Sequence, residues 1–281
     1  MAKPTILPYD RSCDTSSASA LRLDLANIMI GTEDYELRFQ ETKKTSPAQI
    51  FLDSSRRKVF RMHDVVIKFG PSVDAREAQT MHFIKERTRI PIPGATNDGP
   101  NTILMEYVEG CNLQERWPQM LDEEKRRIAE QMCDIIHQLR GLKGNYIGAV
   151  NRGPAVDMRR SSSTGGPFDS ETEFNNFLFE NMISSTPLLY SQSVRQTMKR
   201  DHELVFSHGD LNLHNIIVKD GDIMALLDWE YAGWYPEHWE YVKFCAATLH
   251  DREWHELGPT LFPTTYPDEL IKDQFYGLFV F

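Results

Sequence analysis

Short apolar segments with β-branched residues recur through the first hundred residues. Four of them have the length of a strand and are too short for a helix, namely residues 49–52, 58–62, 65–69 and 102–108. After the third, Asp74 begins a stretch whose apolar residues repeat at helical spacing, and Pro91 and Pro93 prevent that helix from continuing. The pattern predicts a small sheet with one helix beside it.

Helical periodicity dominates the second half of the chain. Asp122 is a suitable N-cap for a helix that runs to about Leu139, since apolar residues recur along one face. Ser170 and Glu173 have the spacing of a capping box, which predicts the start of another helix. Two further helices are expected over residues 237–249 and from about residue 268, and short strands over residues 205–206, 216–218 and 223–227.

The order of these elements predicts an α+β protein with two lobes. We expect an irregular segment over residues 1–20, a strand-rich N-terminal lobe over residues 21–108 and a helical C-terminal lobe over residues 109–281. Residues 161–166, with the sequence SSSTGG, are the most loop-like stretch inside the chain. Because ligand sites favour the interfaces between domains, we expect the chemistry between the two lobes.

Charge and cysteine content narrow the class of protein. The 281 residues include 31 Lys and Arg against 41 Asp and Glu, and the resulting net charge of −10 argues against nucleic acid as a partner. The four cysteines form no C-x-x-C pair and are expected to be reduced thiols. The N-terminus lacks an apolar signal region and no run approaches the roughly 20 apolar residues of a membrane span, so we expect a cytoplasmic protein. Nothing in the pattern indicates an oligomeric state.

The strongest chemical signal is FSHGDLNLHNIIV, residues 206–218, followed by ALLDWEYAGWYPEHWEYVKF, residues 225–244. Asp210 follows a short strand, Asn215 comes five positions later, and Asp228 ends a further strand. In phosphoryl-transfer sites one Asp accepts the proton of the substrate hydroxyl, while an Asn and a second Asp hold Mg²⁺. The order therefore predicts Asp210 as the base and Asn215 and Asp228 as ligands of Mg²⁺, a hard cation that prefers oxygen.

These residues also have other interpretations. A single Asp at a strand end is common in turns. His208 and His214 beside Asp210 raise the possibility of zinc, but their spacing is not that of a helical ligand pair and no third ligand is evident. We favour a bracing role for His208 in the loop. The aromatic residues that follow Asp228 are most simply explained by packing in the core.

The HGDLNLHN segment, followed by LLDWE, resembles the catalytic motif of the aminoglycoside phosphotransferase and choline kinase-like enzymes, especially fungal members. IPIPG, LMEYVEG and GPFDSETEFN, at residues 90–94, 104–110 and 166–175, are similar as well. The resemblance runs from about Arg57 to the C-terminus. It implies a protein-kinase-like fold, with a small antiparallel-sheet lobe and a larger helical lobe, and an ATP-dependent transfer to a hydroxyl of a small molecule.

Carried over to this chain, Lys68 resembles the strand lysine that contacts nucleotide phosphates, and Glu77 resembles its acidic partner. Residues 105–108 resemble the hinge whose backbone binds adenine, which implicates Glu106, Tyr107 and Val108 in nucleotide binding. The implied cofactors are ATP and Mg²⁺, although the motif does not separate ATP from GTP as the donor.

The chain departs from protein kinases where those enzymes cover the phosphates with a glycine-rich loop. Here LDSSRRKVF, residues 52–60, contains no glycine. We expect Ser54 and Ser55, helped by Arg56 or Arg57, to hold phosphate instead. The missing glycines also favour an alternative, a nucleotide-binding pseudokinase or regulatory module on the same fold. A third possibility is a kinase-fold protein that catalyses a different transfer.

The acceptor is the least determined part of the interpretation. An aminoglycoside-like sugar, an amino alcohol or a secondary metabolite would all suit the motif. Asp169, Glu230, Trp234 and Tyr235 are expected to contact the acceptor, since acidic and aromatic side chains would suit a cationic molecule. We expect the loop at residues 161–166 to border the same position.

Overall fold

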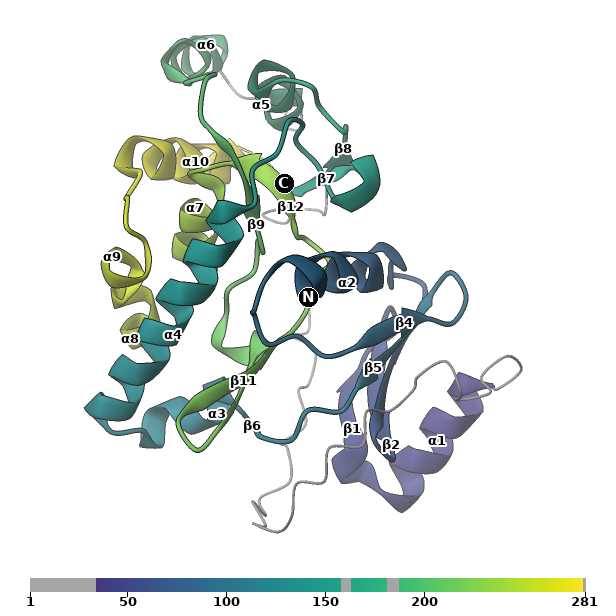
Figure 1. Cartoon of the computed structure of the whole chain (residues 1–281). Helices are drawn as coiled ribbons and strands as arrows, with labels where there is room; N and C mark the ends of the chain where they lie inside the picture. The colour runs from purple at the N-terminus through teal and green to yellow at the C-terminus, as the bar shows by residue number, and fades with distance from the viewer. Residues whose placement is uncertain (1–33, 158–162, 181–186, 280–281) are drawn as a thin grey trace.

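The computed structural model describes residues 34–157, 163–180 and 187–279 (Figure 1). The irregular segment predicted over residues 1–20 lies outside the described residues. The described part contains a five-stranded antiparallel sheet near the N-terminus and a mainly helical region after it. The predicted α+β class is confirmed.

The sheet has the strand order β1-β2-β3-β5-β4. In chain order the strands are β1 (Ile50–Asp53), β2 (Lys58–Met62), β3 (Val65–Phe69), β4 (Ala95–Asn97) and β5 (Thr102–Glu106). All four strands predicted from apolar runs are confirmed to within two residues. Strand β4 was missed, because its three residues include only one apolar side chain and give no alternation to detect.

The two faces of this sheet pack against different helices. Successive side chains of β3 point to opposite faces, so Val65 and Ile67 pack beside Phe39 of α1 (Tyr35–Thr45), whereas Lys68 faces α2 (Arg76–Arg87). Figure 1 shows α2 between the sheet and the helical region. Helix α1 was not predicted, since Phe39 is its single buried residue and an apolar stripe is missing.

The helical region is built around one long helix and several short ones. Its helices are α3 (Leu113–Arg116), α4 (Asp122–Gly141), α5 (Glu171–Glu180), α6 (Leu188–Thr197), α7 (Trp239–Ala247), α8 (Arg252–Glu256), α9 (Gly258–Leu261) and α10 (Pro267–Phe279). Single 3₁₀ turns lie at Pro47–Gln49, Trp117–Gln119, Val150–Arg152 and Leu213–Asn215.

Helix α4 supplies the apolar stripe on which this region packs. Its predicted inner face is buried, with Ile128, Met132 and Ile136 almost completely shielded from solvent. The predicted cap is wrong by one residue: Leu121 is the N-cap and Asp122 is the first helical residue. Glu124 accepts a hydrogen bond from the Leu121 N–H at 2.8 Å, which is the half of a capping box that the third helical residue supplies.

Two small sheets shape the segments that carry the sequence motif. Strand β10 (Ile216–Lys219) lies between β11 (Asp222–Leu226) and β6 (Cys111–Asn112). Strand β9 (Leu204–Ser207) pairs antiparallel with β12 (Gly233–Pro236), with Ser207 opposite Gly233. Because β9 precedes Asp210 and β12 follows Asp228, this pairing draws the two ends of the motif together.

The loop predicted over residues 161–166 is only partly described. Residues 161 and 162 lie outside the described residues, whereas Ser163–Gly165 forms β8, which pairs antiparallel with β7 (Ala155–Asp157). The prediction of a loop is therefore wrong for these three residues. Pairing with β7 supplies the hydrogen bonds that small polar residues do not specify locally.

Among the described residues, no helix combines the length and the apolar character needed to cross a membrane.

Candidate active site

The turn that leaves β9 places Asp210. Gly209 has a φ of +84°, and a Cβ there would come within 3.1 Å of Tyr231, so glycine is favoured both by conformation and by space. The Asp210 N–H donates to Nδ1 of His208 at 3.2 Å, which closes the turn. The carboxylate of Asp210 is therefore set by a tight local structure rather than by an extended loop.

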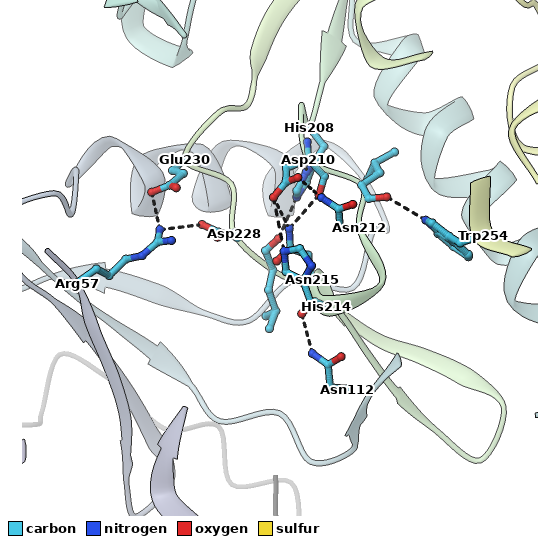
Figure 2. Close-up of polar contacts among 12 residues, drawn as sticks. Arg57, Asn112, His208, Asp210, Asn212, His214, Asn215, Asp228, Glu230 and Trp254 are labelled. Atoms are coloured by element: carbon cyan, nitrogen blue, oxygen red, sulfur yellow. Dashed lines mark hydrogen bonds and ion pairs between the residues drawn. The ribbon is translucent and has the colours of Figure 1, made fainter. Parts of the chain in front are cut away.

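Two asparagine amides hold the Asp210 carboxylate (Figure 2). Nδ2 of Asn215 lies 2.8 Å from Oδ2 and 2.9 Å from the Asp210 carbonyl oxygen, and the amide of Asn212 donates to Oδ1. Burial raises the pKa of Asp210 above its ordinary value, against the opposing effect of these hydrogen bonds. The result is an oriented carboxylate that binds a proton more readily than an exposed Asp.

His208 connects this turn to the end of the next strand. Its Nε2 donates to the Leu227 carbonyl at 3.0 Å while Nδ1 accepts from the Asp210 N–H. That pattern requires a neutral ring, and burial lowers the pKa of His208 to about 4. Since Leu227 directly precedes Asp228, the histidine joins the backbones that carry the two aspartates. The bracing role predicted for His208 agrees with this geometry.

Two contacts from outside the motif hold the same loop. The side-chain amide of Asn112 donates to the His214 carbonyl at 2.7 Å, and the indole N–H of Trp254 donates to the Leu211 carbonyl at 3.1 Å (Figure 2). Both are long-range contacts, so the loop conformation depends on β6 and α8 as well as on its own sequence.

Glu240 on α7 is a further support that the sequence analysis did not identify. Its carboxylate accepts hydrogen bonds from the backbone N–H of His208 and, at 3.0 Å, of Gly209. The side chain is buried, and burial raises its pKa to about 7, against the effect of these two donors. Glu240 lies inside the segment that carries the resemblance, but its spacing gave no sign that it turns back to the HGD turn.

Replacing Glu240 by alanine is expected to lower the free energy of unfolding by about 2–6 kcal/mol. Two buried N–H groups would lose their acceptor, at a cost of about 1–3 kcal/mol each. Glu240→Gln keeps one acceptor oxygen and should cost less. Denaturant unfolding of both variants measures the difference, and an alanine variant as stable as the wild type would show that this carboxylate does not hold the turn.

Asp228 lies beyond the end of β11 and faces the N-terminal sheet. Its φ of +63° is a left-handed conformation, unusual for a residue other than glycine and often found at functional sites. Oδ1 of Asp228 lies 2.8 Å from Nζ of Lys68 and 3.7 Å from the guanidinium of Arg57. Burial would raise the pKa of this carboxyl, but the two cations hold it at about 2.

Lys68 is the centre of a buried charge network. Its Nζ lies 2.7 Å from Glu77, 2.8 Å from Asp228 and 3.8 Å from Glu230. Burial alone would lower the pKa of Lys68, but these carboxylates raise it, so the ammonium is retained. Burial raises the pKa of Glu77 to about 7 despite the nearby ammonium. The structure thus brings Lys68 and Glu77 together across β3 and α2.

The turn between β1 and β2 contributes Arg57 to this network. Its guanidinium donates to Glu230 at 2.9 Å, across 173 positions of sequence (Figure 2). Burial would lower the pKa of Arg57, but Asp228 and Glu230 raise it. From the sequence, Arg57 was expected only to help the serines hold phosphate, whereas in the structure its side chain is the one that reaches the charge network.

Three carboxylates of the network could hold a divalent cation. One oxygen from each of Glu77, Asp228 and Glu230 lies within 4.8 Å of the others, and oxygen ligands suit Mg²⁺. Asn215, the other predicted ligand, donates through Nδ2 to Asp210, so its side-chain oxygen is the atom that could bind metal. The donor set present fits a hard cation.

The chain matches the model of the phosphotransferase enzyme family over residues 50–262. It belongs to this family. It is 25% identical over 236 residues to an aminoglycoside 3'-phosphotransferase of Enterococcus faecalis, covering 79% of this chain and 84% of the relative. A second aminoglycoside 3'-phosphotransferase, from Staphylococcus aureus, is 25% identical over 235 residues with the same coverage. The predicted family is confirmed, and the protein is a phosphotransferase.

Solved structures of the family confirm the predicted fold. A thermostable mutant of aminoglycoside phosphotransferase APH(4)-Ia, in ternary complex with AMP-PNP and hygromycin B, aligns with a TM-score of 0.55 and 10% identity over 85% of this chain and 87% of that one. The GDP complex of aminoglycoside 2'-phosphotransferase-IIIa aligns with a TM-score of 0.54 and 13% identity over 88% of each. The two-lobed, kinase-like architecture of this phosphotransferase follows from these alignments.

The structure of this phosphotransferase does not favour the phosphate role predicted for Ser54. Its hydroxyl donates to the Arg57 carbonyl at 2.7 Å and accepts from the Arg57 N–H at 3.0 Å, so it serves the β1–β2 turn. A hydroxyl at this position closes the turn by local hydrogen bonds, a common role for serine. Ser55 is exposed at the same turn. Arg57, rather than either serine, is the side chain directed to the charge network.

The predicted hinge follows β5, where the chain passes from the sheet to the helical region. The Glu106 carboxylate accepts from the Gly94 N–H at 2.6 Å, and the Tyr107 N–H donates to the Asp64 carbonyl at 2.9 Å. Val108 is half-buried. The segment is thus anchored to its neighbours at two points, and its role in binding nucleotide stays a prediction.

The four residues predicted to contact the acceptor do not form one group. Glu230 belongs to the charge network with Arg57. Tyr235 is completely shielded, with its ring stacked on Trp239 at 5.0 Å, so it is a core residue and its predicted acceptor contact is not supported. Trp234 packs on Phe206 at 5.1 Å.

Asp169, the fourth of these residues, is exposed and pairs with Arg152 at 2.5 Å. Its backbone N–H also donates to Glu173 at 3.0 Å, which places it at the start of α5. Its position two residues before α5 accounts for an acidic residue, because negative charge is favourable near the N-terminus of a helix. An acceptor role for Asp169 finds no further support among its contacts.

Proposed function

We propose that this phosphotransferase moves the γ-phosphoryl group of ATP to a hydroxyl of a small molecule, with Asp210 as the base. One observation carries the proposal: Asp210 and Asp228 are joined through His208, and Asp228 meets Lys68 and Glu77 of the N-terminal sheet. Asp210, the proton acceptor, therefore lies in the helical region, and Lys68, the cation that would bind phosphate, lies in the N-terminal sheet. A nucleotide would bind between these two regions.

Asp210 would accept the proton of the acceptor hydroxyl as its oxygen forms the new bond to the γ-phosphorus. The bond from that phosphorus to the bridging oxygen breaks at the same time, and ADP leaves. The amides of Asn212 and Asn215 orient the carboxylate toward this task. Burial raises the pKa of Asp210, and this makes its ionised carboxylate a better proton acceptor.

Asp228 and Asn215 would hold Mg²⁺, and Glu230 is close enough to contribute an oxygen or bind its waters. The bound ion would neutralise charge on the phosphates and orient them. The low pKa of Asp228 keeps its carboxylate ionised throughout the working pH range, as a metal ligand must be. Lys68 would bind the α- and β-phosphates while Glu77 holds its ammonium in place.

Arg57 would take over the task of the absent glycine-rich loop. Its guanidinium is part of the N-terminal turn, is only partly exposed, and points at Asp228 and Glu230. When a nucleotide enters and Asp228 engages metal, this guanidinium would lose a partner and gain a phosphate. Arg binds phosphate through a planar fork of donors, so one side chain can replace several backbone N–H groups.

Arg57→Gln is expected to raise the Michaelis constant for ATP by about 10–100-fold, because a hydrogen bond to a charged group contributes about 1.5–3 kcal/mol. The matched control is Arg56→Gln, which removes the same charge from the adjacent, exposed residue. Steady-state kinetics at saturating acceptor measures both. Equal effects of the two substitutions would mean that the general positive charge of the turn matters and that Arg57 has no specific role.

The acceptor is proposed only as a class: a hydroxylated small molecule such as an aminoglycoside-like sugar, an amino alcohol or a secondary metabolite. The two curated relatives named as aminoglycoside 3'-phosphotransferases support the first of these. The deciding experiment incubates the protein with labelled ATP, Mg²⁺ and a panel of such acceptors, and identifies phosphorylated products by mass. ATP binding without transfer to any acceptor would favour the pseudokinase alternative, for which the glycine-free turn is the motivating observation.

A further inference from the structure

A second group of buried and half-buried ionisable side chains lies away from the catalytic residues. Glu171 at the start of α5, His202 just before β9 and His238 just before α7 each offer one ligand atom, and these atoms all lie within 4.8 Å of one another. The pairing of β9 with β12 explains the meeting of the two histidines. Leu204 lies opposite Pro236, so His202 and His238, each two residues beyond that pair, become neighbours with ring centroids 4.5 Å apart.

This group is remote from phosphoryl transfer. His202 and His208 lie at opposite ends of β9, six residues apart, which corresponds to about 20 Å of extended chain. Among the described residues, the polar contacts of Glu171 and His202 run to one another and to Glu269, none of which has a part in the reaction we propose. A role for the group must therefore be sought in its own chemistry.

Glu171 holds His202 by two contacts. Oε1 of Glu171 lies 2.7 Å from Nδ1 of His202, and Oε2 accepts from the His202 backbone N–H at 3.0 Å. Both side chains are more than nine-tenths buried, at 7% exposed for His202 and 4% for Glu171. A carboxylate and an imidazole nitrogen are thus held together in a place that water reaches poorly.

The other ring nitrogen of His202 has no hydrogen-bond partner. Nε2 is fully shielded and faces Oε1 of Glu269 on α10 at 3.7 Å, an oxygen that also lacks a hydrogen bond. This separation is too long for a hydrogen bond. Buried polar atoms are nearly always satisfied, so the unpaired Nε2 of His202 indicates that the group is completed by something that shifts the ring or its protonation.

A small cavity adjoins these side chains. It is lined by Glu171, His202, His238 and Glu269 and has a volume of about 30 Å³, room for an ion or a water and little else. Lys199 and Lys272 approach Glu269 at 3.3 and 3.8 Å. Because these lysines compete for Glu269, Glu171 is the carboxylate better placed to serve a cation.

We propose that Glu171, His202 and His238 form a binding site for a divalent transition-metal ion of the zinc type. Two imidazoles and a carboxylate are a preferred donor set of Zn²⁺, whereas Mg²⁺ favours oxygen alone. The ion would replace the proton between Nδ1 of His202 and Glu171. The Nε2–H of the same ring would then donate to Glu269, the outer carboxylate that orients a metal-bound histidine. The ion would fasten α5 to β9 and α7 and would have a structural role.

The test uses Co²⁺ as a spectroscopic substitute for Zn²⁺, with the intact protein and millimolar Mg²⁺ present to occupy the catalytic carboxylates. The wild type is expected to bind one Co²⁺ with visible ligand-field absorption, and unlabelled Zn²⁺ should displace it. His202→Gln and His238→Gln should each weaken binding by about 100-fold or more, since each removes a direct ligand. His82→Gln is the matched control, because His82 also pairs with a glutamate, at 3.0 Å, but on the exposed face of α2.

A second measurement needs no substitution. The melting temperature of the wild type should rise with Zn²⁺ and fall after treatment with a chelator, because an ion that binds only the folded state stabilises it. The affinity should increase from pH 6 to pH 8, because the ion competes with a proton for His202. Burial lowers the pKa of His202, but Glu171 and Glu269 raise it above the ordinary value.

The opposite outcome is equally clear. The metal assignment is wrong if the wild type binds Co²⁺ no more tightly than the His202→Gln variant does. It is also wrong if neither Zn²⁺ nor a chelator changes the melting temperature of the wild type. The group would then be a protonated histidine held between Glu171 and Glu269. We expect ATP binding to be the same in His202→Gln, His238→Gln and the wild type. This test can therefore fail without any consequence for the proposed catalytic function.

Discussion

Asp210→Asn is expected to lower kcat by about 10²–10⁴-fold while leaving the affinity for Mg·ATP within a few-fold of the wild type. Asparagine fills the same space but cannot accept the proton of the attacking hydroxyl, and a positioned base contributes about this factor. The nucleotide contacts we propose come from other residues, so binding should survive. Single-turnover kinetics for the acceptor identified by the panel, together with calorimetric titration of Mg·ATP, separates the two effects.

The pH dependence gives this prediction a second readout. Burial raises the pKa of Asp210, so its proton is lost at a higher pH than from an exposed Asp. Only the ionised carboxylate can act as base, and kcat/KM should therefore fall as the pH drops through that raised pKa. Residual activity of Asp210→Asn should lack this acidic limb.

The matched control for this substitution is Asp222→Asn. Asp222 lies in β11 and pairs with Arg127 at 2.7 Å on the surface, away from the aspartates of the motif. The Asp222→Asn variant should retain full turnover, and its kcat/KM should still fall at low pH. Turnover of Asp210→Asn within a few-fold of the wild type would remove Asp210 from the role of base.

Asp228→Ala is expected to abolish transfer, with kcat reduced by about 10³-fold or more, because the triphosphate would lose the residue that fixes its metal. The structure predicts a more specific effect on binding. Without Asp228, Lys68 and Arg57 lose a negative partner and become more attractive to phosphate. Metal-free ATP should therefore bind at least as tightly as in the wild type, while the gain in affinity from Mg²⁺ should disappear.

Calorimetric titration of ATP with and without Mg²⁺ tests this pattern, which simple damage to the fold would not produce. Asn215→Ala should reduce the Mg²⁺ effect less completely than Asp228→Ala does, since the side chain of Asn215 is a neutral ligand. Glu230→Gln removes a second carboxylate that pairs with Arg57 and lies near the proposed metal, and it should reduce the Mg²⁺ effect less than Asp228→Ala does. An unchanged Mg²⁺ dependence in both Asp228→Ala and Asn215→Ala would overturn the metal assignment.

The fold class, most of the strands and the region of the site could be predicted from the sequence because they depend on local patterns. Alternation and β-branched residues gave the ranges of β2 and β3 to the residue. The HGD turn, Asn215 and Asp228 lie within 20 positions of one another and are tied by short-range contacts such as Asn215 to Asp210. Local chemistry of this kind is present in the sequence whatever surrounds it.

Elements that depend on distant partners escaped the sequence analysis. Helix α1 has almost no apolar stripe and is held through Phe39 against the sheet. Tyr235 belongs to an aromatic series after Asp228, and only the packing of Trp239 against it decided that it is core and not binding surface. Sequence shows that an aromatic side chain is present, but burial depends on which elements fold over it.

The charge relations were decided by tertiary structure alone. Arg57 and Glu230 are 173 positions apart, Glu240 reaches back 32 positions to His208, and Glu171 meets His202 across 31. Charged side chains carry little periodic signal, because most of them are solvated on the surface and only burial with a partner gives one a specific role. The sequence by itself determined which groups could perform phosphoryl transfer, and the folded chain decided which carboxylate each cation meets.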